Sequence, residues 1–276
     1  MQIVSEMLPE PPESQDRVFT TPSAAIVLDG ASAFVPVEVS TGLYVDTLGG
    51  CLRSRLLDDP TTDLAAALGD AIEFAATELD LHPGASPSST VAIARQYGGA
   101  VDLLVLGDTQ VRTNHGVLCD DRIGKVATDE RRAYQNRLRL GKGYDEEHRA
   151  LLRALQKEQA RYRNRRYGYW IAETEPAAAK KSVTARYNVQ ETPWCVIATD
   201  GAYRPLDLFA GDWHHSALTV ADLGQLLEEA QNWEHSTDPR GSINPRAKRH
   251  DDKTIVLMRD LDKVHYPSPT TELPGS

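Results

Sequence analysis

The chain has little cysteine and no long hydrophobic segment. Its three Cys residues are an odd number and lack the spacing of metal ligands, which fits a reducing cytoplasm. No stretch approaches the roughly 20 apolar residues that a membrane-spanning helix needs. The N-terminus also lacks the basic and then apolar pattern of a secretory signal. These absences predict a cytoplasmic protein with no membrane partner.

What is present is typical of a soluble globular protein. Of the 276 residues, 41% are hydrophobic and 25% are charged, which is ordinary for a folded domain. The length suffices for one large domain or two smaller ones. The net charge of −10 is unevenly distributed, because residues 120–166 contain fourteen Lys and Arg against eight Asp and Glu. An otherwise acidic chain therefore carries one basic segment.

Four short stretches each join an apolar, β-branched run to carboxylates. They are residues 26–30, 104–108, 196–201 and 250–257. A short apolar run bounded by Gly or Asp is typical of a buried strand, and carboxylates at strand ends can converge at one edge of a sheet. Converging carboxylates repel each other unless a cation compensates them, and a cluster of oxygen ligands suits Mg²⁺ or Mn²⁺. For any one stretch, Asp and Gly could be ordinary turn residues; the four together favour a metal site.

These stretches belong to an ordered set of short motifs. In sequence order they are Ser14-Gln15-Asp16, Asp29-Gly30, Ser89-Thr90-Val91-Ala92, Gly107-Asp108-Thr109-Gln110, Ala198-Thr199-Asp200-Gly201 and Asp251-Asp252-Lys253-Thr254. The residues of these motifs and their order resemble those of the metal-dependent protein phosphatases of the protein phosphatase 2C family, in its bacterial form. The resemblance spans residues 14 to 257.

The resemblance implies an α+β fold, a four-layer α-β-β-α sandwich of two antiparallel sheets with helices outside. It also implies a charged helical insertion at about residues 120–182 within a phosphatase domain over residues 13–266. The first twelve residues, rich in Pro and Glu, and the tail 267–276, rich in Pro, Ser and Thr, are expected to be flexible. Helical spacing of apolar residues predicts helices over residues 63–81 and about 220–233.

The resemblance also implies two Mg²⁺ or Mn²⁺ ions and no side-chain nucleophile. The metal ligands carried over are Asp29, the Gly30 carbonyl, Asp200 and Asp251. Three further carboxylates would lie around the pair and hold metal-bound water or a third, weaker metal: Asp16, Asp108 and Asp252. A water activated by the two metals would attack phosphorus in line.

Four positions depart from the pattern of the family. An arginine that grips the substrate phosphate is replaced by Pro11, and Gln110 stands where the Gly-Asp-Ser-Arg turn has arginine. Ala31 occupies a position that is histidine in animal members and often differs in bacterial ones. Arg204 replaces an acidic ligand of the third metal. Because a guanidinium cannot ligate a metal, Arg204 is expected to pair with Asp108 or to contact the substrate phosphate.

The basic segment 120–166 ends in a cluster of arginines and a tyrosine at residues 161–166. It could be a solvated helix whose basic face offsets the acidic body. It could also be a flap whose arginines supply the missing phosphate contacts. Nucleic-acid binding is a third possibility, which the overall acidic charge disfavours.

Three functions follow from this sequence. The first is a metal-dependent phosphoric monoester hydrolase that acts on phosphoserine and phosphothreonine in proteins. The second is the same chemistry on a small phosphorylated metabolite, with the insertion closing over it. The third is a non-catalytic relative that binds a phosphorylated partner or regulates an assembly. The retained aspartates favour the first two functions, and the missing arginine favours the second or third.

Overall fold

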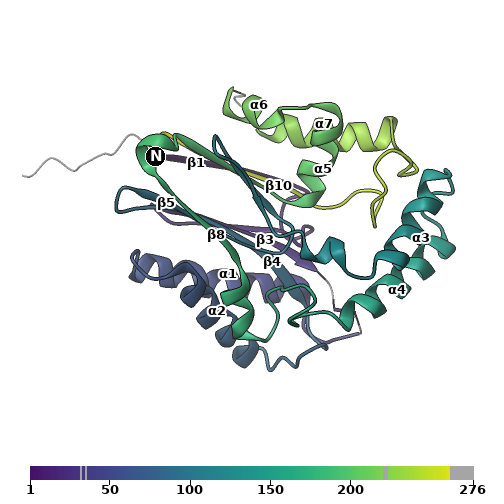
Figure 1. Ribbon diagram of the computed structural model, residues 1–276, viewed down its shortest axis with the longest axis horizontal. Coiled ribbons are helices and arrows are strands. Elements are labelled where there is room, and N and C mark those ends of the chain that lie inside the picture. The colour runs from purple at the N-terminus through teal and green to yellow at the C-terminus, as the bar shows by residue number, and fades with distance from the viewer. Residues whose placement is uncertain (32, 35, 220–222, 262–276) are drawn as a thin grey trace, which may run out of the picture.

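Two antiparallel five-stranded sheets pack face to face in the computed structural model, which describes residues 1–31, 33–34, 36–219 and 223–261 (Figure 1). The first sheet has the order β1-β10-β9-β6-β7 and the second the order β2-β3-β4-β5-β8. The strands of the first sheet are β1 (Gln2–Leu8), β10 (Lys253–Arg259), β9 (Trp194–Ala198), β6 (Gln110–Thr113) and β7 (Gly116–Cys119). Those of the second are β2 (Arg17–Thr20), β3 (Ala24–Ala31), β4 (Ser88–Tyr97), β5 (Ala100–Leu106) and β8 (Val183–Asn188).

Helices cover the outer faces of both sheets (Figure 1). On the second sheet lie α1 (Thr41–Asp58) and α2 (Leu64–Glu78); on the first lie α5 (Asp200–Phe209), α6 (Trp213–Thr219) and α7 (Leu223–Ser236). Side-chain caps fix where helices begin, because Ser40 accepts a hydrogen bond from the Leu43 amide and Asp63 accepts one from the Ala66 amide. The predicted four-layer α-β-β-α sandwich is confirmed.

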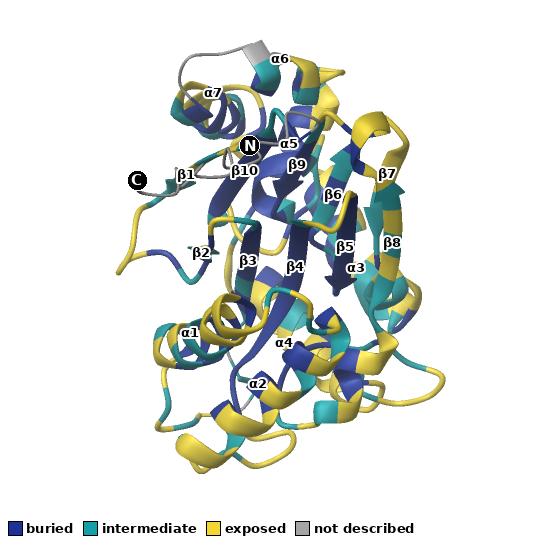
Figure 2. Ribbon diagram, turned by 90° about the vertical axis from the view of Figure 1, so that its left-hand side faces the viewer, coloured by how far each residue is buried: buried dark blue, intermediate teal, exposed yellow. Residues whose placement is uncertain are grey.

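The alternation of side chains along β3 shows how one strand serves two cores. Ala24, Ile26 and Leu28 pack beneath α1 and α2. Ala25 and Val27 point the other way and pack against residues of the first sheet. This period of two is inherent to a strand, and in Figure 2 the central strands are accordingly buried while the outer helix faces are exposed. Each fully buried Leu, Ile or Val contributes about 1.5–3 kcal/mol.

The predicted insertion lies between β7 and β8. It contains the 3₁₀ turns η1 (Arg122–Lys125) and η2 (Pro176–Lys181) and two α-helices, α3 (Thr128–Arg139) and α4 (Glu146–Ala160); a further turn, η3 (Val189–Glu191), follows β8. The two α-helices form a hairpin at one end of the sandwich (Figure 1). A small apolar cluster of Tyr134, Leu138 and Leu155 holds the hairpin together.

The N-terminus departs from the sequence-based expectation. Residues 2–8 form β1, which pairs antiparallel with β10 along its whole length. The expectation that residues 1–12 are flexible is therefore wrong for residues 2–8. Val4 and Leu8 pack against the core beneath α7, and Ile3 packs against the core between the sheets. The prolines that suggested a loose segment follow the strand, at positions 9, 11 and 12.

Other local expectations have mixed outcomes. The helix expected at residues 63–81 is confirmed as α2. The helix expected at about 220–233 corresponds to α7, although residues 220–222 lie outside the described residues. The expected flexible tail 267–276 also lies outside them.

Across the described part of the chain, no helix is both long enough and apolar enough to cross a membrane.

Replacing Val4 with Asp should lower the free energy of unfolding by about 2 kcal/mol or more, because it places a charge against the apolar core beneath α7. Ser5→Asp, at an exposed position of the same strand, should change it by less than about 0.5 kcal/mol. Urea denaturation followed by circular dichroism measures both values. Equal, small losses would show that β1 is not docked on the core.

Candidate metal centre

The strand register brings three aspartate motifs to one edge of the first sheet. Ala198, the last residue of β9, pairs with Ile255 of β10 on one side and with Gln110 of β6 on the other. Asp200 follows β9, whereas Asp251 and Asp108 precede β10 and β6. Because neighbouring strands are antiparallel, the end of β9 lies beside the starts of the other two. All three carboxylates therefore leave the sheet at the same edge.

The second sheet contributes Asp29 from β3, and the turn around Gly107 joins the two sheets at this edge. Thr90, the residue opposite Asp29 on β4, shares a hydrogen bond of 2.6 Å with the hydroxyl of Thr109, which precedes β6. Gly107 has a φ of +93°, and a Cβ there would lie 2.7 Å from the Thr90 side chain. Only glycine allows this turn to pass so close to β4.

Asp29 has the most strongly perturbed carboxyl of the cluster. Burial raises its pKa well above the usual range, and the charges of Asp16, Asp200, Asp251 and Asp108 raise it further. No described cation pairs with the Asp29 side chain. Its environment thus strongly favours a compensating positive charge.

Asp16 is held by two threonine hydroxyls. Thr199 and Thr254 both donate to its Oδ2, at 3.0 and 2.7 Å. Burial raises the pKa of Asp16 to about 7, while the Thr254 hydrogen bond opposes this shift and the charge of Asp252 adds to it. Asp252 in turn accepts a hydrogen bond of 2.6 Å from the backbone amide of Gln15. The N-terminal and C-terminal motifs are thereby tied together.

Two cations neutralise part of the cluster. Nη2 of Arg204 lies 3.1 Å from Oδ2 of Asp108 and 3.2 Å from Oδ2 of Asp200. Burial raises the pKa of Asp200 to about 6, although Arg204 opposes the shift. Lys248 binds Oδ1 of Asp251 at 2.8 Å, with a side chain that is 56% exposed. Of the two expected partners for Arg204, Asp108 is the one the structure places beside it.

Gly30 and Gly201 lie where two backbone segments approach each other too closely for a side chain. A Cβ at Gly30 would lie 2.6 Å from the Gln15 carbonyl oxygen, and one at Gly201 would overlap the carbonyl oxygen of Asp252. Gly30 therefore lets the segment of Asp29 pack against that of Asp16, and Gly201 lets the segment of Asp200 pack against that of Asp251 and Asp252. This packing role is separate from the metal-ligand role expected for the Gly30 carbonyl.

The donor set fits Mg²⁺ or Mn²⁺ in chemical type and in charge. Every expected ligand is an oxygen donor, and Asp29 is half-buried beside four other acids. The three expected carboxylate ligands are Asp29, Asp200 and Asp251, and their oxygens do not all lie within 4.8 Å of one another. Among the described residues, the group of three whose ligand atoms do lie that close is Asp212, His214 and His215, near the start of α6. Lys248 contacts only Oδ1 of Asp251, so Oδ2 has no ion-pair partner among the described residues.

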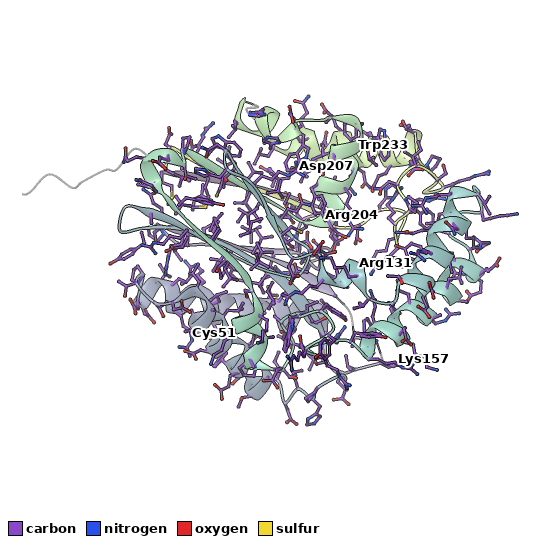
Figure 3. The ribbon with its side chains drawn as sticks, in the orientation of Figure 1. Cys51, Arg131, Lys157, Arg204, Asp207 and Trp233 are labelled. Carbon is purple, nitrogen blue, oxygen red and sulfur yellow. The ribbon has the colours of Figure 1, made fainter. Side chains whose placement is uncertain are left out.

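A cavity of about 230 Å³ opens beside the cluster. Asp108, Asp200 and Asp251 lie on one side of it, and residues of the insertion lie on the other. Arg204 and Arg131, which both line the cavity, face it from α5 and α3 respectively (Figure 3). The cavity therefore adjoins the carboxylates and is walled in part by the insertion.

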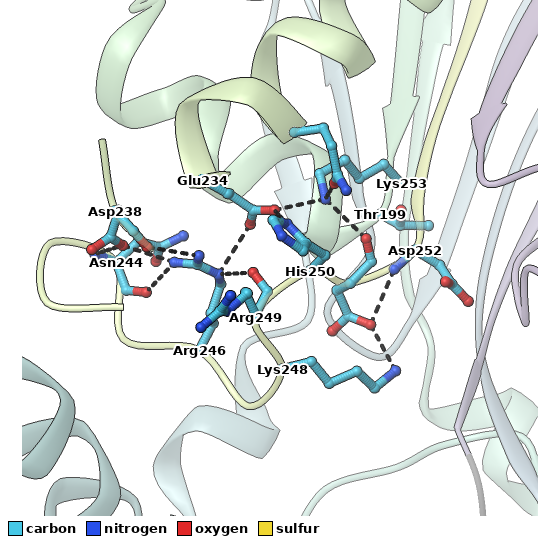
Figure 4. Close-up of polar contacts among 12 residues, drawn as sticks. Thr199, Glu234, Asp238, Asn244, Arg246, Lys248, Arg249, His250, Asp252 and Lys253 are labelled. Atoms are coloured by element: carbon cyan, nitrogen blue, oxygen red, sulfur yellow. Dashed lines mark hydrogen bonds and ion pairs between the residues drawn. The ribbon is translucent and has the colours of Figure 1, made fainter. Parts of the chain in front are cut away.

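The loop that leads to Asp251 is anchored by a buried ionic network (Figure 4). Glu234 of α7 binds Arg246 at 3.1 Å, His250 at 3.1 Å and Lys253 at 2.8 Å. Arg246 also binds Asp238 at 2.7 Å. Lys253 donates to the backbone carbonyl of Asp251 at 2.9 Å. These contacts fix the backbone on both sides of Asp251.

Sequence reasoning did not assign roles to several of these residues. Thr199 and Thr254 were present in two of the motifs, so their position beside aspartates was a usable signal. Lys248 had none, because its contact with Asp251 depends on how the preceding loop folds. Arg131 likewise lies in a helix of mostly solvated charges, and only the cavity distinguishes it.

No protein-family model matches the chain, and no curated protein sequence matches it significantly. Information about related proteins therefore comes from structure alone.

Several solved structures have the same fold. The PPM Ser-Thr phosphatase MsPP from Mycobacterium smegmatis, in complex with cacodylate, superimposes with a TM-score of 0.52 at 15% identity, over 94% of this chain and 98% of that one. The catalytic domain of the serine/threonine phosphatase PstP with two manganese ions gives 0.51 at 15% identity, over 93% and 96%. A bacterial serine phosphatase gives 0.54 at 10% identity, over 94% and 96%. The chain has the fold of the PPM, or 2C-type, serine/threonine phosphatases.

The raised pKa values predict how pH affects the metal-free protein. Since the pKa values of Asp16 and Asp200 are about 7 and about 6, the folded state binds more protons than the unfolded chain between about pH 4 and 7. The contribution of these groups to stability is therefore lost as pH rises through that window. In EDTA, Asp29→Asn should melt at a higher temperature than the unmodified protein at pH 8, with a smaller difference at pH 5.

The control for this experiment is Asp70→Asn, which alters an exposed ion pair with Arg55 and should leave the melting temperature nearly unchanged at both pH values. Addition of Mn²⁺ at pH 8 should stabilise the unmodified protein more than Asp29→Asn. A variant that is destabilised equally at both pH values would contradict the repulsion of the buried carboxylates.

Arg204 should limit the number of bound metal ions. Because its guanidinium compensates Asp108 and Asp200, the unmodified protein should bind at most two Mn²⁺ ions. Arg204→Asp should add one weakly bound ion, whereas Arg204→Ala removes the charge without adding a ligand. Equilibrium dialysis with elemental analysis gives these numbers. Three ions in the unmodified protein would show that Arg204 does not replace a third cation.

Proposed function

We propose that the chain is a Mg²⁺- or Mn²⁺-dependent phosphoric monoester hydrolase. The observation that supports this most is the partly buried aspartate cluster beside a cavity. Within this cluster, Asp29 has no ion-pair partner among the described residues. The fold, shared with the PPM phosphatases, is consistent with the same function. In this proposal Asp29, the Gly30 carbonyl, Asp200 and Asp251 hold the two ions.

Two bound divalent cations would lower the pKa of a bound water and would compensate the negative charge of the phosphate oxygens. Asp16 is suited to orient water, because both threonine hydroxyls donate to its Oδ2 and leave Oδ1 as an acceptor. Asp252 supports this arrangement through the amide of Gln15, next to Asp16. Asp16, supported by Asp252, would thus position water beside the place where the phosphate would lie.

Arg204 can contribute to phosphate binding from the cavity wall. Its Nη2 serves both Asp108 and Asp200, while its guanidinium has five N–H donors in total. The remaining donors can reach an anion in the cavity. Arg204 would then partly replace the phosphate-binding arginine that is absent at Pro11.

A second function has one observation in its favour. The ion pairs of Arg204 with Asp200 and of Lys248 with Asp251 neutralise two of the carboxylates without metal. A non-catalytic module that binds a phosphorylated partner could use this arrangement. Phosphate release that depends on Mn²⁺ distinguishes the hydrolase from the module.

Asp200→Asn should lower Mn²⁺-dependent hydrolysis of p-nitrophenyl phosphate by about 100-fold or more, because it removes one anionic ligand and weakens metal binding. The fold should persist, with a melting temperature in EDTA at least equal to that of the unmodified protein. Asp212→Asn, an exposed substitution near α6, serves as the matched control and should retain full activity. Undiminished turnover in Asp200→Asn would exclude this residue as a metal ligand.

A further inference from the structure

The wall of the cavity opposite the aspartate cluster is mainly apolar. It is built by the insertion together with one residue of the segment after β3. Its apolar and aromatic members are Phe34, Ile123, Tyr134, Leu152, Leu155, Tyr169 and Ile171. A phosphate held at the carboxylate side would therefore have its organic group directed toward a hydrophobic surface. Burial of apolar area against this surface would favour binding.

Four arginines also line the cavity, and one differs from the rest. Arg163 pairs with Glu173, Arg204 with Asp108, and Arg246 with Glu234. Arg131 forms no ion pair with any carboxylate that the structure describes.

The donors of Arg131 are only partly used. One of its terminal nitrogens, Nη2, donates to the Ile123 carbonyl at 2.9 Å. Its Nε is buried and has no hydrogen-bond partner in the described structure. A buried donor without a partner is costly, and an arginine fork matches the geometry of a carboxylate or phosphate. Arg131 is thus a cation on the cavity wall with donors left to bind an anion.

We propose that the substrate is a small phosphomonoester whose compact, apolar organic group carries a second acidic group that binds Arg131. This inference rests on the proposed hydrolase function and specifies its substrate class. The phosphate would lie at the aspartate cluster, the organic group against the insertion, and the second acid at the start of α3. Water would add to phosphorus, the bond from phosphorus to the organic oxygen would break, and that oxygen would take one proton of the water.

The size of the cavity favours a small molecule over a protein segment. About 230 Å³ lies just below the roughly 300–1,000 Å³ of typical ligand pockets, so the occupant must be compact. The insertion wall faces the carboxylates across this limited space, and α4 is fastened there by a hydrogen bond of 2.9 Å between His148 and the Ala247 carbonyl. This contact joins the insertion to the loop before β10, which also lines the cavity.

The experiment compares phenyl phosphate with 4-carboxyphenyl phosphate in the full chain with Mn²⁺. The unmodified protein should prefer the carboxylated substrate by about tenfold in kcat/KM, as expected for one charge-assisted hydrogen-bonded pair. Arg131→Gln should abolish this preference by lowering kcat/KM for 4-carboxyphenyl phosphate to the value for phenyl phosphate, while Arg131→Lys should restore part of it. Arg132→Gln, its exposed neighbour on α3, should keep the preference.

A second pair of variants tests the apolar wall. Leu152→Trp should lower kcat/KM for both aryl phosphates, because Leu152 lines the cavity. Leu151→Trp changes a residue that packs on the same hairpin cluster but does not line the cavity, and it should have a smaller effect. Equal effects of the two variants would argue against this wall as part of the substrate site.

Failure of the substrate proposal can be separated from failure of the hydrolase function. Turnover of phenyl phosphate without any preference for the carboxylated compound, or faster turnover of a phosphothreonine peptide, would overturn the substrate class and leave the hydrolase function standing. If no substrate is turned over, isothermal titration calorimetry should compare the binding of 4-carboxybenzylphosphonate with that of benzylphosphonate. Tighter binding of the carboxylated probe that is lost in Arg131→Gln would support the site, and equal or absent binding would refute it.

Discussion

The repulsion among closely spaced, partly buried carboxylates is the constraint on which the rest of the site depends. Asp29 lies within the electrostatic reach of four other aspartates, and burial alone raises its pKa. Such a group is tolerated only where charge compensation is strong. The threonine hydroxyls on Asp16 and the ion pairs of Arg204 and Lys248 provide part of that compensation. The remaining negative charge, concentrated on oxygen donors, is what makes the edge of the sheets suitable for divalent cations.

The surroundings of the cluster connect parts of the chain that are far apart in sequence. Glu234 joins α7 to the loop before β10 through Arg246, His250 and Lys253. The same loop contacts the insertion where His148 bonds to the Ala247 carbonyl. A change in the insertion could therefore affect the segment that carries Asp251. In the proposed hydrolase, this gives the insertion a structural link to the metal ligands as well as a wall of the cavity.

The sequence was most informative where motif and secondary structure coincide. The apolar runs that end in Asp200 or follow Asp251 are strands, because alternate residues face the two sides of a sheet that is covered on both faces. It was misleading at residues 2–8, where an isolated strand has a weak pattern and gains stability only by pairing with β10. The basic cluster at residues 161–166 also had no distinguishing pattern. Arg163 is buried against Glu173, ten positions away, and stacks at 4.1 Å on Phe34. The second contact joins segments more than a hundred residues apart.

The sequence by itself determined the set of aspartates, since strand-end carboxylates and glycines are local features that the chain carries in order, and the resemblance of these motifs to a known family implied the sandwich fold. The tertiary structure alone decided which cations compensate them. Arg204 pairs with Asp108 across 96 positions, a contact that follows from the register of β6 beside β9. It also decided that Arg131 lies on the cavity wall without an ion pair to any described carboxylate. Charge compensation depends on distances and burial, and these arise only when separate segments pack together.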